Sequence, residues 1–346
     1  MNKIDMREIT EDELNEYLRV IGSEAYRAKQ VLDWVYNKKI KSIEEMTNLS
    51  KKLREDLQNE FYVSGLILLQ EMVSKDGTRK FLFELEDKQK IESVLMPDDK
   101  RLTLCLSTQV GCKFNCSFCY TGKMGFSRNL TAGEIVNQIM LVSRKEKRIT
   151  NIVLMGMGEP LDNYENVIKA VKIIYSPWGL GISASKITLS TCGLIPGLKR
   201  LKDEKLNFNL AISLNASDDN VRNRLMPVNK KYPLKELLKA CREYPLKPNK
   251  KRITFEYVLI RDVNDSVKDA KQLADLLKGI KCKINLLPFN KRPDGKSQYD
   301  SPYQDKVDKF HEYLISRNFS VFTRKQRGID ISASCGQLTA SCSANY

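Results

Sequence analysis

From residue 101 onward, short apolar strand-like runs alternate with longer stretches whose apolar residues recur at helical spacing. We predict strands at residues 102–106, 152–155, 186–190, 208–214, 253–259 and 283–287, with a seventh at 319–325. Helical patterns such as 131–145 and 265–279 lie between them. Repeated strand–helix units build a parallel sheet whose outer face the helices cover. The sequence therefore predicts an α/β fold, a partial β/α barrel of six units.

Two regions of different pattern precede this barrel. Residues 1–60 carry apolar residues at helical spacing with Lys and Arg between them, and residues 61–100 change to strand-like runs separated by turn signals. We expect a small helical accessory domain at 1–60, a short β-rich connecting segment at 61–100, the barrel at 101–335 and a C-terminal tail at 336–346.

The predicted strands also indicate where a site would lie. Barrel sites form at the C-terminal ends of the strands. Five segments each follow one of the predicted strands, namely the loop Cys112–Cys119, GMGEP, STCG, Asn215 and PFN. Three strands alternate polar and apolar residues, and the polar sets are Thr103, Cys105 and Ser107; Thr188 and Ser190; and Asn209, Ala211, Ser213 and Asn215. Closed barrels normally fill their interior with branched apolar side chains. We therefore expect a cavity for a polar ligand, although any single hydroxyl could instead bond to neighbouring backbone.

Cys112, Cys116 and Cys119 form a C-x3-C-x2-C pattern. Structural zinc takes four ligands, and the chain offers one histidine, His311, on the solvated face of a predicted helix, and no second C-x2-C pair. The charged N-terminus lacks the apolar stretch of a signal peptide. We therefore expect a cytoplasmic protein with reduced cysteines. Iron–sulfur clusters are held by cysteine thiolates, and three ligands on four irons leave one iron open to a substrate or cofactor.

The chain carries 58 Lys and Arg against 43 Asp and Glu, a net charge of +15. This excess predicts a polyanionic partner, either a nucleic acid or an anionic membrane surface. No apolar run is long enough to cross a bilayer. With one histidine, general acid–base chemistry must rely on other side chains.

The cysteine pattern, with Phe118 before the last cysteine, resembles the signature of radical S-adenosylmethionine (SAM) enzymes. That resemblance implies a [4Fe–4S] cluster whose open iron chelates SAM, and reductive cleavage of SAM to a 5′-deoxyadenosyl radical. Longer segments resemble the RNA adenine-C2 methyltransferases of this superfamily: FCYTGKMGFSRNLTAGEI, VLMGMGEPLDNY, ITLSTCGLIPGL, RNRLMPVNKKYPL and RGIDISASCGQL. The likeness covers nearly the whole chain.

The resemblance implies methylation of C2 of an adenosine in 23S rRNA at the peptidyl-transferase centre and of the adenosine beside the anticodon in tRNA. It implies that residues 1–60 bind RNA and that a one-electron donor such as flavodoxin or ferredoxin supplies the cluster. Free access for a large RNA favours a monomer, and no membrane partner is expected.

Site residues follow from the same resemblance. Cys112, Cys116 and Cys119 would hold the cluster. The SAM contacts would be Gly158, Glu159, Ser190, Ser213, Leu214, Asn215 and Asn290, with Leu214 contributing backbone. A carboxylate at 159 suits the SAM ammonium. Many relatives carry histidine where this chain has Asn215.

Three further residues would carry the chemistry. Cys335 would take a methyl group from a first SAM, and a second SAM would supply the radical that removes hydrogen from that methyl group. The carbon radical would add to adenine C2, Glu92 would accept the C2 proton, and Cys105 would release the product by forming a disulfide with Cys335. Without the resemblance, Cys105 is a buried strand residue and Glu92 an exposed strand carboxylate.

Four other cysteines and three alternative functions remain. Cys192, Cys241 and Cys282 are expected in the core, and Cys342 could compete for the disulfide. Methylation of adenine C8, which confers antibiotic resistance, would use the same cysteine pair, but GMGEPLDN and KMGFSRNL fit the C2 group better. A radical enzyme that activates a protein would need neither Cys105 nor Cys335, and an RNA-binding zinc protein would contain no iron.

Overall fold

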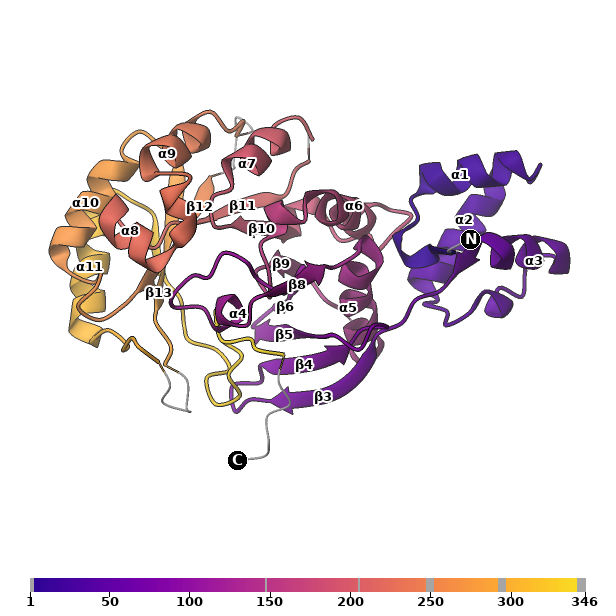
Figure 1. Ribbon diagram of the computed structural model, residues 1–346, viewed down its shortest axis with the longest axis horizontal. Helices are drawn as coiled ribbons and strands as arrows, with labels where there is room; N and C mark the ends of the chain where they lie inside the picture. The colour runs from indigo at the N-terminus through magenta and orange to yellow at the C-terminus, as the bar shows by residue number, and fades with distance from the viewer. Residues whose placement is uncertain (1–2, 147, 205, 247–251, 292–296, 341–346) are drawn as a thin grey trace.

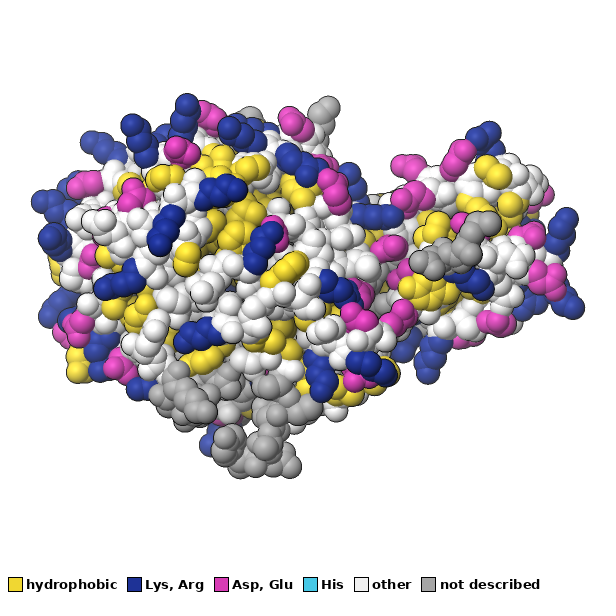
Figure 2. All heavy atoms as spheres, viewed as in Figure 1, with side chains coloured by type: hydrophobic (Ala, Val, Ile, Leu, Met, Phe, Trp, Pro, Cys, Tyr) yellow, Lys and Arg dark blue, Asp and Glu magenta, His cyan; other side chains and the backbone are white. Residues whose placement is uncertain are grey.

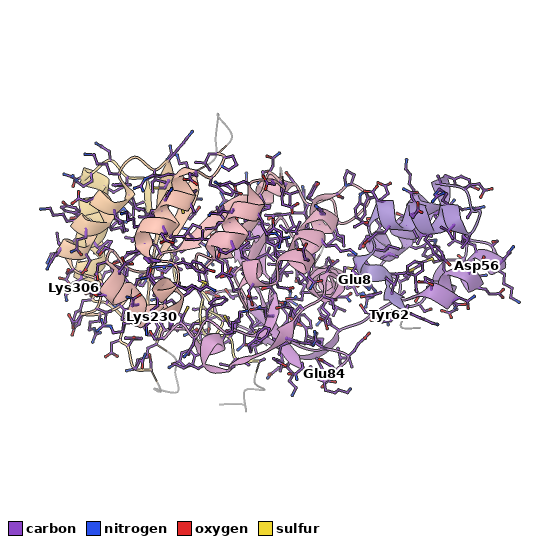
Figure 3. The ribbon with its side chains drawn as sticks, turned by 45° about the horizontal axis from the view of Figure 1, so that its top comes forward. Glu8, Asp56, Tyr62, Glu84, Lys230 and Lys306 are labelled. Carbon is purple, nitrogen blue, oxygen red and sulfur yellow. The ribbon has the colours of Figure 1, made fainter. Side chains whose placement is uncertain are left out.

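The computed structural model describes residues 3–146, 148–204, 206–246, 252–291 and 297–340. A large body built around one curved sheet carries a smaller helical lobe at its N-terminal end (Figure 1). Figure 3 shows the two extremes, with Asp56 on the lobe and Lys306 at the other end of the body. No helix among the described residues is long and apolar enough to cross a membrane.

Seven parallel strands form the barrel part of a ten-stranded sheet. They are β6 (Arg101–Cys105), β9 (Asn151–Leu154), β10 (Ile187–Thr191), β11 (Asn209–Ser213), β12 (Ile253–Leu259), β13 (Cys282–Pro288) and β14 (Val321–Thr323). They pair in chain order, β6 with β9 and so on to β14. All seven predicted strands are confirmed, and each boundary moves by at most two residues.

Helices cover the outer face of these strands (Figure 1). They are α5 (Ala132–Lys145), α6 (Tyr164–Tyr175), α7 (Ile195–Leu201), α8 (Asp219–Leu225), α9 (Leu234–Arg242), α10 (Val267–Leu277) and α11 (Gln304–Ser316). Thr131 begins α5 by a capping box with Glu134. The helix buries Ile135, Val136 and Ile139 completely or nearly so. Each such side chain stabilises the fold by about 1.5–3 kcal/mol, so the apolar stripe fixes the helix on the sheet.

The predicted strands of residues 61–100 extend the same sheet. β3 (Ile67–Val73), β4 (Arg79–Glu84) and β5 (Lys90–Asp98) form an antiparallel meander, and β5 pairs with β6. Arg79 forms ion pairs with Glu71 of β3 and with Glu146 beyond α5. The meander therefore adds a wall to the barrel.

The N-terminal lobe contains the three helices that periodicity predicts. They are α1 (Glu11–Val20), α2 (Tyr26–Leu32, continued by η2, Asp33–Asn37) and α3 (Lys51–Glu60), with the short elements β1 (Ile4–Asp5), η1 (Met6–Glu8), η3 (Ile43–Glu45) and β2 (Phe61–Tyr62). Buried Arg7 joins the lobe to the body, because its guanidinium donates to Ile40 O at 2.6 Å and to Met140 Sδ of α5 at 3.1 Å.

Short elements lie in the connections between these strands and helices, and periodicity does not predict them. They are the hairpin strands β7 (Gln109–Gly111) and β8 (Phe126–Asn129), the helix α4 (Tyr120–Lys123), and the single turns η4 (Pro160–Asp162), η5 (Ala184–Lys186) and η6 (Pro227–Lys230).

On the face in Figure 2, Lys and Arg side chains are spread over the surface without forming one continuous patch. Charge alone therefore does not locate the partner of this +15 chain.

Candidate active site at the barrel mouth

The three-cysteine loop lies between β7 and β8, and backbone geometry fixes its ends. Gly111 has φ +76°, and a Cβ there would lie 2.0 Å from Gly125 O, so only glycine fits. Cys112 N donates to Gly125 O at 2.7 Å, and Cys119 N donates to Cys116 O at 3.0 Å. Backbone hydrogen bonds therefore hold the loop both at Cys112, where it begins, and at Cys119, its last cysteine.

Within this loop the thiols of Cys112, Cys116 and Cys119 lie close enough to influence one another. Burial raises the pKa of Cys112 to about 12, and the neighbouring Cys119 contributes. Burial also raises the pKa of Cys116 well above its ordinary value, with contributions from both other thiols. A bound cation would reverse this balance, because it stabilises thiolates.

The GMGEP segment packs directly against β7. Gly158 has φ +101°, and a Cβ there would lie 2.6 Å from Gln109 Cβ. Gln109 Oε1 accepts from Glu159 N at 2.8 Å, while its amide nitrogen donates to Asp162 Oδ2 at 2.8 Å. Glycine at 158 lets the segment approach this side chain closely, which sets the direction of Glu159.

Glu159 is a buried carboxylate held by backbone donors. One oxygen accepts from Cys192 N at 2.7 Å and the other from Leu161 N at 3.0 Å. Burial raises the pKa of the carboxyl group, and these hydrogen bonds partly offset the rise. No Lys or Arg among the described residues forms an ion pair with Glu159, so a ligand ammonium would complete its surroundings.

The remaining predicted SAM contacts divide into two groups. Ser190 of β10 and Ser213 of β11 alternate with the buried apolar residues Leu189 and Ile212, and among the described residues neither hydroxyl forms a hydrogen bond. Asn215, at φ +60°, is already engaged within the protein: its Oδ1 accepts from Val258 N at 2.9 Å. The Leu214 side chain is fully buried. Asn290 Oδ1 is buried without a partner among the described residues, as expected of an atom that awaits a ligand.

Arg222, for which the sequence predicts no role, ties these loops together. It is fully buried, and its Nε donates to Leu214 O at 2.9 Å. One terminal nitrogen donates to Cys192 O at 2.8 Å and to Ser213 O at 3.1 Å, and the other donates to Asn229 Oδ1 at 2.8 Å. RNRLMPVNKKYPL contains this arginine, but the segment itself does not reveal that three carbonyls converge on it.

Cys335 and Cys105 approach each other from the C-terminal segment and from β6. Cys335 is exposed, whereas Cys105 is buried, and both are free thiols. Burial raises the pKa of Cys105, and the neighbouring Cys335 raises it further. Desolvation raises the pKa of Cys335, and Glu256 and Cys119 contribute to the rise. The fold therefore gathers both cysteines beside the three-cysteine loop.

Glu92 also reaches this site, and its interpretation as an exposed strand carboxylate is wrong. It is 1% exposed, because β4 and the C-terminal segment cover it. Lys80 Nζ lies 3.1 Å from its Oε1, and its Oε2 accepts from Thr339 N at 2.8 Å and from Ala340 N at 3.1 Å. Both carboxylate oxygens thus have donors in this conformation.

A second interior carboxylate, Glu256 of β12, is absent from the sequence-based site. The strand register places it between Ser213 and Asn285, and Asn285 Nδ2 donates to its Oε1 at 2.8 Å. Burial raises its pKa, and Asn285 opposes that shift. The alternation of Thr254, Glu256 and Val258 with aromatic neighbours could have identified it.

The other cysteines and the histidine lie as expected. Cys192, Cys241 and Cys282 are buried. His311 lies on α11, where its Nδ1 is 2.8 Å from Thr323 Oγ1. Cys342 lies outside the described residues.

The residues present fit a cluster and SAM. Among the described residues, no three His, Cys, Asp or Glu side chains converge on a single ion. A four-iron cluster does not require such convergence, because each thiolate binds a different iron. The unpartnered Asn290 Oδ1, and Glu159, which has no ion-pair partner among the described residues, offer polar contacts to a ligand beside the loop.

Comparisons with known proteins agree with this geometry. Residues 106–277 match the radical SAM superfamily, and residues 4–63 match the ribosomal RNA large subunit methyltransferase N-terminal domain. The chain is 51% identical to a dual-specificity RNA methyltransferase RlmN of Pelobacter propionicus, over 97% of this chain and 96% of the relative. It is 50% identical to the enzyme of that name from Geobacter sulfurreducens, over 97% and 92%. The crystal structure of a radical SAM methyltransferase from Sphaerobacter thermophilus superposes with a TM-score of 0.91 at 42% identity, covering 98% of this chain and 100% of that one.

Proposed function

The chain belongs to the RlmN family of radical SAM methyltransferases, and we propose that it methylates adenosine C2 in 23S rRNA and in tRNA through a methylated cysteine. The observation that carries the proposal is the meeting of exposed Cys335 with buried Cys105 beside the three-cysteine loop. Relatives named as dual-specificity RNA methyltransferases, about half identical over nearly the full length, support both RNA classes.

In this proposal Cys112, Cys116 and Cys119 hold a [4Fe–4S] cluster. The cluster and SAM supply a methyl group and a carbon-centred radical, with two SAM molecules used in each turnover. Glu159 and the Gly158 backbone orient the SAM ammonium, and Ser190, Ser213, Leu214, Asn215 and Asn290 complete the binding site. Because the Asn215 side chain and the Leu214 carbonyl are engaged within the protein, these two residues act mainly by shaping the backbone.

Cys335 Sγ is the methyl carrier. As a thiolate it forms a bond to the methyl carbon of SAM, and the sulfonium leaves as a neutral thioether. After the carbon is attached to adenine C2, Cys105 Sγ attacks Cys335 Sγ. The new S–S bond replaces the bond from Cys335 to carbon; the electron pair of the broken bond stays with the carbon, which takes up a proton to become the methyl group, and a reductant later returns both thiols. Exposure of Cys335 suits its reaction with two large partners, whereas burial of Cys105 protects it from other electrophiles.

Glu92 accepts the adenine C2 proton. Its present donors, Lys80 Nζ and the backbone of Thr339 and Ala340, hold the carboxylate against the C-terminal segment. The backbone of residues 339–340 must move away from Glu92 before the adenine of the RNA can lie beside this carboxylate. Release of the accepted proton from Glu92 to solvent then restores the ion pair with Lys80.

The partners follow from this chemistry. A one-electron donor of the flavodoxin or ferredoxin type reduces the cluster, residues 1–60 contribute RNA contacts, and the enzyme acts as a monomer in the cytoplasm. The match of residues 4–63 to an rRNA methyltransferase domain supports the RNA-binding role.

The first test is mass spectrometry of the protein purified without added cofactor. The C-terminal tryptic peptide begins at Gly328, and fragmentation separates Cys335 from Cys342. We expect a methyl group on Cys335, and 2-methyladenosine after nucleoside digestion of RNA treated with the enzyme. A cluster-loaded protein that leaves Cys335 unmodified after incubation with SAM would refute the methyl-carrier mechanism, and 8-methyladenosine would refute the C2 assignment.

A further inference from the structure

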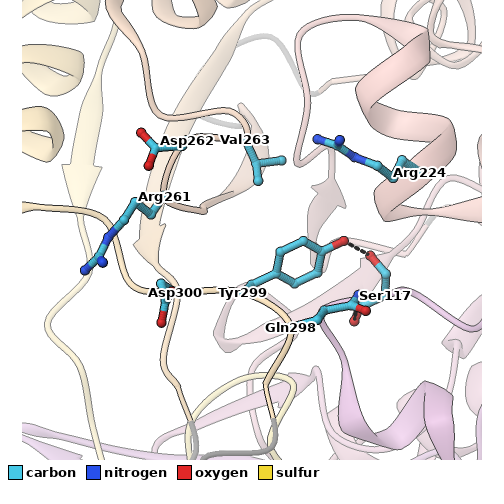
Figure 4. A pocket seen from close by; sticks show the side chains of 8 residues that line it. All are labelled: Ser117, Arg224, Arg261, Asp262, Val263, Gln298, Tyr299 and Asp300. Atoms are coloured by element: carbon cyan, nitrogen blue, oxygen red, sulfur yellow. Dashed lines mark hydrogen bonds between the residues drawn. The ribbon is translucent and has the colours of Figure 1, made fainter.

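A cavity of about 500 Å³ opens at the rim of the barrel mouth (Figure 4). Its lining is Ser117, Arg224, Arg261, Asp262, Val263, Gln298, Tyr299 and Asp300. These residues come from the three-cysteine loop, the end of α8, the loop after β12 and the segment that precedes α11. None of them belongs to the proposed SAM or cysteine chemistry.

The three-cysteine loop forms one wall of this rim cavity. Ser117 lies between Cys116 and Cys119, and its Oγ is 2.9 Å from Tyr299 OH. Gln298 Nε2 donates to Ser117 O at 3.2 Å, and Ser117 N donates to Leu225 O at 2.9 Å. Val263 and Tyr299 pack on a small apolar cluster that includes Leu225 and Phe289. A ligand in the cavity would therefore sit on the loop that surrounds the cluster site.

The rim cavity carries two guanidinium groups whose charge is not neutralised. Arg224 is exposed and forms no ion pair among the described residues. Arg261 Nε donates to Ser301 O at 2.7 Å, and its guanidinium stacks on Tyr303 at 4.2 Å, which fixes the group without cancelling its charge.

The two acids of the lining are already paired. Asp262 bonds to Lys306 Nζ at 2.7 Å, and Asp300 bonds to Lys291 Nζ at 2.9 Å. The Lys291 ion pair lowers the pKa of Asp300. The lining therefore presents net positive charge to a ligand, in spite of its two carboxylates.

We propose that this rim cavity binds the phosphodiester of a nucleotide that flanks the target adenosine. The inference rests on the proposed function and names one RNA subsite for it. An enzyme that acts on a base inside RNA must hold the strand while that base leaves its stack. Arginine is suited to phosphate, because its planar fork donates two parallel hydrogen bonds. The volume lies within the usual range for small-ligand sites.

The shape of the cavity favours a nucleotide over an acidic redox protein. A protein partner typically covers about 800 Å² of surface on each side, whereas this site is a concavity lined by only eight residues, among them one phenol ring, one amide and two arginines. The redox protein nevertheless provides the competing outcome in the test.

The test compares Arg224→Ala with Arg242→Ala in the full-length, cluster-loaded enzyme. Arg242 is an exposed arginine that lines a second surface cavity of about 500 Å³ between α9 and α10, so it controls for loss of one charge. RNA affinity is measured with a tRNA transcript at several salt concentrations. We expect Arg224→Ala to weaken binding about tenfold and to reduce the salt slope by about one, as loss of one phosphate contact does. Arg242→Ala should match the wild type.

Four results distinguish the possibilities. Methylation of Cys335 by SAM alone should be equal in all three proteins, because it needs no RNA. Equal RNA affinity and salt slope for Arg224→Ala and wild type would overturn the proposal. So would a loss of turnover that appears only with a flavodoxin donor and disappears with a chemical reductant, which would assign the cavity to the donor. Failure of the proposed function would appear separately, as a wild type that methylates neither Cys335 nor RNA.

Discussion

Two parts of the mouth hold reactive groups in different ways. The first, here called the cofactor wall, comprises residues 156–163, 191–194 and 213–215 together with Arg222. The second, called the carrier strap, comprises residues 327–340 and includes Cys335. The wall has a buried polar network, whereas the strap combines part-buried and exposed hydrogen bonds with a few buried contacts, such as the one from Thr121 Oγ1 to Leu338 O.

The cofactor wall is linked through one continuous set of hydrogen bonds. Glu159 accepts from Cys192 N, and Arg222 donates to Cys192 O and Leu214 O. Asn264 Nδ2 donates to Asn215 O at 2.8 Å and so extends the network to β12. Breaking one member leaves buried carbonyls unsatisfied, each at a cost of about 1–3 kcal/mol. The wall is therefore a rigid support for a cofactor that must stay in one place.

The carrier strap is attached on both sides of Cys335 instead. Before it, Gly328 N donates to Asp76 Oδ2 at 2.9 Å, and Ser74 Oγ donates to Asp330 Oδ1 at 2.6 Å. After it, Tyr120 N donates to Gly336 O at 2.7 Å. Segments held by such accessible bonds open at much lower free energy than the core does. The contrast indicates that the methyl carrier can leave the site while the cofactor wall stays folded.

The largest expected effect separates the two parts by their chemistry. Both Cys116→Ala and Cys335→Ala should reduce RNA methylation below detection, because each removes an obligatory sulfur. Only Cys116→Ala should also lose iron and sulfide, and with them reductive cleavage of SAM. Metal analysis and 5′-deoxyadenosine formation measure the difference. Iron loss in Cys335→Ala would contradict the division into cofactor wall and carrier strap.

The next effect is on stability and tests the cofactor wall alone. Arg222→Met should lower the free energy of unfolding by about 3–5 kcal/mol, since three buried carbonyls lose their donor. Urea denaturation of the cluster-free protein measures this change. The matched variant Arg242→Met removes an exposed arginine and should stay within about 0.5 kcal/mol of the wild type. Equal stabilities for the two variants would show that the wall does not depend on its arginine.

A smaller effect concerns the placement of Glu159. Gly158→Ala should weaken SAM binding about tenfold, because the new methyl group would meet Gln109 and push the segment away from β7. Gly181→Ala is the control, since Gly181 also has positive φ but nothing lies within 4 Å of its added Cβ. Isothermal titration of the cluster-loaded proteins compares them. If both variants lose affinity equally, the cause is backbone strain in general and not the contact with Gln109.

Sequence reasoning predicted the periodic parts of this molecule well. Seven barrel strands, the meander and the three N-terminal helices follow from local apolar patterns, which short windows contain. The cysteine loop and the GMGEP segment stood out because their residue types are unusual. The location of Cys335 near Cys105 came from resemblance, since no local pattern predicts that residues 230 positions apart will meet.

The connections between loops could not be predicted in the same way. Arg222 resembles any helical arginine in sequence, and only the meeting of three loops explains why it is buried. The burial of Glu92 depends on Lys80 and on the carrier strap, both distant in sequence. Glu256 follows the alternation of β12, so strand periodicity alone is enough to assign its carboxylate to the face opposite Phe255 and Tyr257.

The smallest effect tests how the carrier strap is attached. Partial desolvation alone would raise the pKa of Asp76, but hydrogen bonds from Gly328 and Thr78 lower it to about 2, from an ordinary value of 3.8. A carboxyl group with a depressed pKa stabilises the folded state above pH 3.8 and loses that contribution as the pH falls through about 2. Because Asp76 is exposed, solvent screening reduces the contribution to about 0.5–1 kcal/mol.

Asp76→Ala should therefore speed hydrogen exchange in residues 328–340 at neutral pH about two- to fivefold, while exchange in the cofactor wall stays unchanged. The difference in stability between the variant and the wild type should be constant near neutral pH and shrink between pH 4 and 2. Asp203→Ala, at an exposed aspartate with no side-chain contact among the described residues, serves as the control. Faster exchange in the wall as well as in the strap would mean that the two parts open together. Unchanged exchange in the strap would mean that Asp330 and the Glu92 contacts suffice to hold the methyl carrier, and that Asp76 only orders the turn between β3 and β4.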